Sequence, residues 1–106
     1  MDKITIDVGV HTALEIDLTE FDFTGVSKVV FTIKNVANTQ YPSLFTQEFA
    51  EPKVYSVVIP PNVSLKLSDQ AVYDFTKVLT DGKTYKNGDN GKIELRRGVG
   101  DGNTDS

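Results

Sequence analysis

Apolar and polar residues alternate with a period of two along most of this chain of 106 residues. Ile4, Ile6 and Val8 are separated by polar residues, and the pattern returns in LEIDL after a break. Such alternation places apolar side chains on one face of an extended strand, whereas a helix needs apolar spacings of three and four. No window sustains helical spacing. The chain is therefore predicted to be all-β, with at most a single helical turn around residues 62–67 or 20–23.

Further strand-like runs follow along the chain. In order they are KVVFTIKN, SLFTQEF, KVYSVVI, AVYDFTKVL, a brief return at residues 83–85, and KIELRR. Pro60 and Pro61 end the KVYSVVI run, because proline has no backbone N–H to donate to a ladder. Other breaks are Thr24-Gly25, Asp81-Gly82, which suits a tight hairpin, Asn87-Gly88 and Asn90-Gly91. About seven or eight short strands result, as expected of a sandwich or barrel, with the assignment in residues 36–50 left open.

Composition favours one folded domain. Hydrophobic residues make up 39% of the chain and charged residues 25%, which is enough apolar surface to offset chain entropy. We expect a single domain over residues 1–97, and a flexible tail or the start of a linker over residues 98–106. No segment resembles a signal peptide or is long and apolar enough to cross a bilayer, so no membrane association is expected.

Charge and cysteine content exclude several kinds of site. The chain has no cysteine, so it can hold neither a disulfide nor a thiolate metal site. Its formal charge is −4, and the basic residues are scattered apart from Arg96 and Arg97. Nucleic-acid binding is not expected, because phosphate contacts need clustered Lys and Arg.

Residues that could carry catalysis are few. His11 is the only histidine and lies in a turn-like segment, so we interpret it as a solvated loop residue rather than a general base. The acidic residues near the N-terminus are interpreted as a solvated polar face; they are Asp7, Glu15, Asp17, Glu20 and Asp22. A glycosidase-type pair would need two carboxyl groups facing across a cleft, which sequence cannot show. No catalytic residue is predicted.

Three further segments contain residues that calcium, glycan or phosphate sites use. The oxygen-rich segment after Thr80 contains Asp81, Asn87, Asp89 and Asn90, but its spacing does not reproduce a calcium loop, and turn chemistry explains these residues. Asn62-Val63-Ser64 matches a glycosylation acceptor only formally. The glycines of residues 98–102 precede no helix and so form no phosphate loop. No metal and no cofactor is predicted.

The segment before the AVYDF strand resembles the tyrosine corner of immunoglobulin-like domains. Asp69, Ala71 and Tyr73 match its Asp-x-Ala-x-Tyr pattern, and Leu67 stands where an apolar residue usually precedes it. Phe75 takes the position of the usual disulfide cysteine. The resemblance implies an immunoglobulin-like antiparallel β-sandwich with Greek-key connections. It also implies that the Tyr73 hydroxyl bonds to backbone a few residues upstream, a structural rather than a catalytic role.

A second resemblance covers most of the chain. Its motifs, in order, are Phe23-Thr24-Gly25, Phe31-Thr32-Ile33-Lys34, Tyr73-Asp74-Phe75, Asp81-Gly82 and Gly91-Lys92-Ile93. This order is similar to the N-terminal domains of tailed-phage upper baseplate proteins and related tail-associated β-sandwich modules. The resemblance implies a structural part of a virion, located in the phage tail or in the bacterial cytoplasm before assembly, that contacts other virion proteins and copies of itself.

The leading hypothesis is therefore a non-enzymatic assembly module of a phage or prophage virion. Its candidate contact residues are Phe21, Phe23 and Phe45. The alternative is a bacterial surface adhesion or carbohydrate-binding module, in which aromatic side chains stack on sugar rings; its candidates are Tyr41, Tyr55 and Tyr85. A small hydrolase has only scattered carboxylates to support it. Sequence leaves the host, the oligomeric state, the partner surface and the full length of the protein open.

Overall fold

A computed structural model of the chain describes residues 3–35, 42–86 and 91–97. The strands are β1 (Lys3–Asp7), β2 (Thr12–Asp17), β3 (Val26–Lys34), β4 (Phe45–Phe49), β5 (Val54–Ile59), β6 (Val72–Leu79), β7 (Thr84–Lys86) and β8 (Gly91–Arg96), and the helix is α1 (Pro61–Ser64). Strands dominate the described residues, which confirms the all-β prediction. None of these residues forms a helix of the length and apolarity needed to span a membrane.

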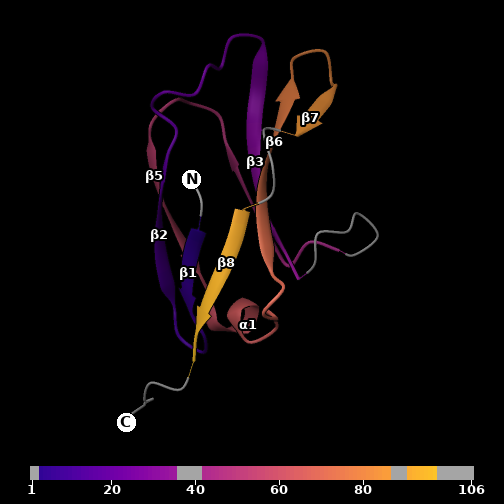
Figure 1. Ribbon diagram of the computed structural model, residues 1–106. Coiled ribbons are helices and arrows are strands. Elements are labelled where there is room, and N and C mark those ends of the chain that lie inside the picture. Colours follow the sequence, from indigo (N-terminus) through magenta and orange to yellow (C-terminus); the bar gives the residue numbers. More distant parts are fainter. Residues whose placement is uncertain (1–2, 36–41, 87–90, 98–106) are drawn as a thin grey trace.

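The strands form two sheets. Six strands form one sheet in the order β1-β8-β6-β3-β4, with β7 also paired to β6, and β2 pairs with β5 in the other (Figure 1). All pairings are antiparallel except that of β1 with β8, which is parallel. The expectation of a purely antiparallel arrangement is therefore wrong at this edge. Because almost the whole chain separates β1 from β8, no short connection dictates their relative direction.

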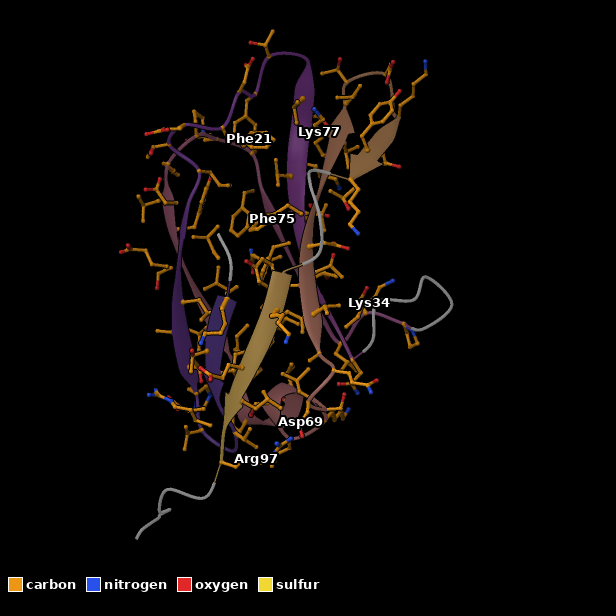
Figure 2. The ribbon with its side chains drawn as sticks, viewed as in Figure 1. Phe21, Lys34, Asp69, Phe75, Lys77 and Arg97 are labelled. Carbon is orange, nitrogen blue, oxygen red and sulfur yellow. The ribbon has the colours of Figure 1, made fainter. Side chains whose placement is uncertain are left out.

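The core lies between the two sheets. Val29, Phe31 and Ile33 of β3 are fully buried, as their alternation predicts, and Ile16 and Ile59 approach them from the smaller sheet. Figure 2 shows Phe75 pointing from β6 into the space between the sheets. Both sheets thus share one core, and the outer face of β8 carries the polar half of its alternating run, whereas that of β5 carries Val54 and Val58.

Turn chemistry follows the predictions closely where the structure describes it. Gly82 has φ of +91° in the β6–β7 hairpin, where the Leu79 N–H donates to the Lys83 carbonyl at 2.8 Å. Gly25 has φ of +73° just before β3. Glycine alone adopts such values without strain, so both predicted breaks are confirmed as turns. The brief strand expected at residues 83–85 is β7, shifted by one residue.

The predicted helical turn after the proline pair is α1, with Pro61 in its first turn. Its last residue, Ser64, is fully buried, and its Oγ accepts a hydrogen bond from the Gly9 N–H at 3.0 Å. This contact ties the helix to the turn between β1 and β2. The alternative helical turn at residues 20–23 is wrong: the Phe21 N–H donates to the Leu18 carbonyl at 3.0 Å in a tight turn instead.

The strand-like run SLFTQEF, in the region of residues 36–50 whose assignment was left open, is confirmed as β4, which pairs with β3. Two other local assignments differ from expectation. The break predicted from Val10 to Ala13 is shorter, because β2 already begins at Thr12. Gly91, interpreted as a turn residue, is the first residue of β8. The physical reason for a glycine there lies in the packing of Tyr73.

Candidate functional site

The residues of the proposed tyrosine corner lie in and beside the turn that leads from α1 to β6. Ala71 is buried; its N–H donates to the Ser68 carbonyl at 3.0 Å, and its own carbonyl accepts from the Ile93 N–H at 3.2 Å. Tyr73 is 3% exposed, with its ring centroid 5.8 Å from that of Phe31. The corner therefore joins the last strand to the core. The hydroxyl bond of Tyr73 to upstream backbone stays a prediction.

Tyr73 packs directly against the backbone of Gly91. The two residues are paired across β6 and β8. A Cβ atom placed on Gly91 would lie 2.1 Å from Cζ of the Tyr73 ring and 2.5 Å from its hydroxyl oxygen. No side chain fits in that space, so the Tyr73 ring can occupy its buried place only if residue 91 is glycine. Sequence reasoning missed this pair, because it interpreted Asn90-Gly91 as a turn before the final strand.

The exposed residue of the corner, Asp69, is bound by Arg97, which follows β8. The Arg97 guanidinium donates to the Asp69 carboxylate at 2.7 Å and to the Leu67 carbonyl at 3.3 Å (Figure 2). The neighbouring Arg96 forms a bidentate pair with Asp7 at 2.6 and 3.0 Å, and the carboxylate raises the pKa of Arg96. Both arginines of the basic pair are thus engaged in holding β8 to its surroundings.

The opposite end of the molecule is formed by loops that aspartates organise. Asp17 accepts hydrogen bonds from the N–H and hydroxyl of Thr19, at 2.9 and 2.6 Å. Asp22 accepts from the Thr24 N–H at 2.9 Å, and Asp81 accepts from the Lys83 N–H at 3.0 Å. Each is an Asx turn, in which a carboxylate replaces a backbone acceptor. We call this the loop end: residues 18–25, 50–53 and 80–83.

The hydrogen bonds from Thr19 and Thr24 lower the pKa of Asp17 and Asp22 below the ordinary 3.8. Their contribution to folding is therefore complete above the unfolded pKa and is lost as pH falls through the lower folded values. We expect both carboxyl groups to titrate below pH 3.8 in carbonyl-detected NMR. Asp22→Asn keeps an acceptor oxygen without the titration, so it should flatten the acid limb of the stability profile; an unchanged limb would contradict this assignment.

Aromatic side chains at this end are largely occupied by packing. Phe21 and Phe23 contact each other edge-to-face, with centroids 4.9 Å apart, and Figure 2 shows Phe21 and Lys77 on this side of the molecule. Both phenylalanines pack partly buried against the core. As candidate contact residues they thus expose only part of their surface.

The aromatic candidates for sugar binding separate into different environments. Tyr55 stacks on Phe49 at 4.4 Å, and its hydroxyl accepts from the Glu51 N–H and donates to the Glu51 carbonyl, both at 3.1 Å. It therefore closes the β4–β5 loop. Tyr85 is 49% exposed on β7, opposite Lys77. Tyr41 lies outside the described residues. The structure does not bring Tyr55 and Tyr85 together into a platform.

The candidate catalytic and metal-binding residues are dispersed. His11 is exposed immediately before β2, and the N-terminal carboxylates lie in strands or loops with solvent access. Within residues 3–35, 42–86 and 91–97, no group of three His, Cys, Asp or Glu side chains could hold a metal. Asn87, Asp89 and Asn90 lie outside the described residues.

One open depression of about 400 Å³ lies beside the corner. Its lining is Lys3, Asp69, Lys92, Ile93, Glu94 and Leu95. Lys3 and Glu94 pair with each other across it at 3.3 Å. The depression therefore holds a charged, solvent-open surface of β1 and β8 rather than an enclosed apolar site with converging polar groups.

Comparison with known proteins leaves the chain without an assigned family. No family model, no curated protein and no solved structure matches it.

Proposed function

We propose that the chain is a non-enzymatic assembly module of a phage or prophage virion, in the tail or baseplate, that acts through protein–protein contacts. The observation that carries the proposal is the outer face of β5, where Val54 is 48% exposed and Val58 50% exposed. Exposed apolar side chains that gather on one surface mark interaction sites more often than scattered ones. Both valines lie on an edge strand, since among the described residues β5 pairs with β2 alone.

Further apolar exposure extends this surface toward one end. Val10 is 54% exposed in the β1–β2 turn, and Leu65 is 67% exposed just after α1. The Gly9–Ser64 hydrogen bond holds these two segments together. On β2, Ala13 pairs with Val58, whereas Asp17 pairs with Val54 at the other end of β5. A partner that covers this face would meet apolar side chains alone around Val58 and a valine beside a carboxylate around Val54.

The proposal includes an immunoglobulin-like arrangement of the strands. Three features support it: two sheets around one core, a short helix between β5 and β6, and a buried tyrosine at the start of β6. The order of the phage-like motifs supports the virion assignment. Three of those five motifs lie in strands of the larger sheet, Phe23-Thr24-Gly25 forms the turn before β3, and Asp81-Gly82 lies in the β6–β7 hairpin turn.

The test is mass spectrometry of virus-like particles purified from an induced culture of the source organism. The chain should be recovered at fixed stoichiometry with tail proteins. Val54→Asp together with Val58→Asp should lower its incorporation, because a charge on the contact face opposes burial. Thr84→Asp, which changes an exposed residue of β7, is the matched control. Recovery of the chain only in the cell envelope or the medium, with particles free of it, would overturn the proposal.

That negative result would favour the adhesion alternative. Tyr85 is the aromatic side chain that supports it, since it is exposed beside Lys77 and could present its ring to a sugar. A glycan array, with Tyr85→Ala as the comparison, would then be the next measurement. Loss of glycan binding in that variant would support the adhesion module.

A further inference from the structure

Strand β4 ends the larger sheet and has an open edge. It pairs with β3 over its whole length, and no strand of the described residues pairs with its other side. Thr46, Gln47 and Glu48 are exposed. In an edge strand, alternate backbone N–H and C=O groups point away from the sheet, so β4 offers unpaired donors and acceptors along one side.

The two end strands of the order β1-β8-β6-β3-β4 are built differently. At the other edge, β1 carries ion pairs at both ends, Lys3 with Glu94 at 3.3 Å and Asp7 with Arg96 at 2.6 Å. β4, with the sequence FTQEF, contains neither lysine nor proline, the residues that most often protect an edge against pairing. Its one charge, Glu48, is neutralised by Lys28 of the same chain at 2.9 Å. β4 is thus the less protected edge.

The sequence of β4 is self-complementary in an antiparallel pairing. If two copies of FTQEF meet about Gln47, Gln47 lies opposite Gln47 of the second copy, Phe45 opposite Phe49, and Thr46 opposite Glu48. No like charges face each other, and aromatic pairs flank the centre. We propose that β4 is a dimerisation edge, at which a second copy of this chain adds its own β4 in antiparallel register about Gln47.

The aromatic environment of the strand supports a second copy as the occupant. Phe45 is partly buried, with its ring 6.4 Å from Phe31, and Phe49 is buried against Tyr55. Phe45, Gln47 and Phe49 share one face of β4, because side chains alternate along a strand. Twofold pairing would cover the remaining exposed surface of Phe45 with the partner copy's β4, at the position of its Phe49, whose own ring stays buried. Such an interface is closed and isologous, since each copy contributes the same strand.

The inference deepens the proposed function, on which it rests in part, by naming one partner of the module. Its first test uses the absence of cysteine from the chain. Gln47→Cys should form a disulfide-linked dimer under mild oxidation, because residues directly opposite at a twofold axis have Cβ atoms about 5 Å apart. Thr46→Cys is the matched control: its nearest equivalent is a diagonal neighbour about 7–8 Å away, too far for a disulfide.

We expect the Gln47→Cys dimer to form at least about tenfold faster than the Thr46→Cys dimer, since an interface raises the effective thiol concentration. Equal rates for the two variants would overturn the assigned register. Without oxidant, light scattering of the unmodified chain should show its mass doubling as concentration rises. Gln47→Lys should stay monomeric at every concentration, with an unchanged far-UV spectrum, because it places like charges opposite each other.

The outcomes separate this inference from the proposed function. A chain that is monomeric at all concentrations but is recovered in particles would overturn the dimerisation edge and leave the virion assignment standing. A chain that dimerises through β4 but is absent from particles would overturn the virion assignment and leave the dimerisation edge standing. Dimerisation that survives Gln47→Lys would place the contact elsewhere on the molecule and also overturn the inference.

Discussion

Replacing Gly91 by alanine should destabilise the folded chain by about 3 kcal/mol, the upper range for overpacking a filled site. The added methyl group would lie 2.1 Å from Cζ of Tyr73, far inside van der Waals contact. Relief would require the Tyr73 ring to leave its buried place or β8 to separate from β6 at their paired residues. Urea unfolding monitored by circular dichroism measures the loss directly.

Two further variants make this prediction specific. Gly82→Ala, at a positive φ of +91° with no atom within 4 Å of the added carbon, should cost only about 1 kcal/mol of backbone strain. In the background of Tyr73→Leu, which removes the ring, Gly91→Ala should cost much less than in the unmodified chain. Additive costs in this double-mutant cycle would contradict the proposed contact between the ring and the glycine.

The strands could be predicted from sequence because side chains alternate between the two faces of a strand and one of those faces is buried. Val29, Phe31 and Ile33 had to share a face, and that face had to be covered, so their burial followed from alternation alone. The end of β5 could be predicted for an equally local reason, the missing donors of Pro60 and Pro61. Such features depend on a residue and its chain neighbours.

Pairing between distant segments could not be predicted in this way. The parallel contact of β1 with β8 and the ion pair of Asp7 with Arg96 join residues 89 positions apart. Alternation is the same whether a neighbouring strand runs parallel or antiparallel, and the run SLFTQEF does not show that its strand, β4, pairs with β3. The role of Gly91 was hidden for the same reason, since the atoms that forbid a side chain there belong to Tyr73.

The loops and exposed surfaces also divide into features set by chain neighbours and features set by distant segments. The Asx turns at Asp17, Asp22 and Asp81 use partners two residues away. Asp-Gly was used as a turn signal at Asp81, whereas the equally local Asp-x-Thr pattern at Asp17 and Asp22 was not. The exposure of Val54 and Val58 reverses the expected burial of valine and depends on which face of β5 meets the core. Alternation showed that one face would be covered, and the structure shows which.

Phe31→Ala should cost about 3–5 kcal/mol, the range for truncating a fully buried aromatic side chain. Phe31 is completely buried at the centre of β3, and its ring centroid lies 5.2 Å from Phe75 and 5.8 Å from Tyr73. Its backbone is paired with β4 on one side and β6 on the other, so β3 has little freedom to move into the cavity. The melting temperature should fall by about 15 °C or more, given several degrees per kcal/mol in a domain of this size.

Because whole domains are stable by only about 5–15 kcal/mol, the variant could be largely unfolded, and Phe31→Leu gives a second point on the same scale. It keeps most of the volume and should cost about 1 kcal/mol.

Phe45→Ala is the matched control on the neighbouring strand: it removes the same ring at a partly buried edge position and should cost less than half as much as Phe31→Ala. Equal losses for the two alanine variants would mean that β4 is covered as fully as β3. Concentration-dependent stability of the unmodified chain, absent in Gln47→Lys, would then identify the second copy as what covers it.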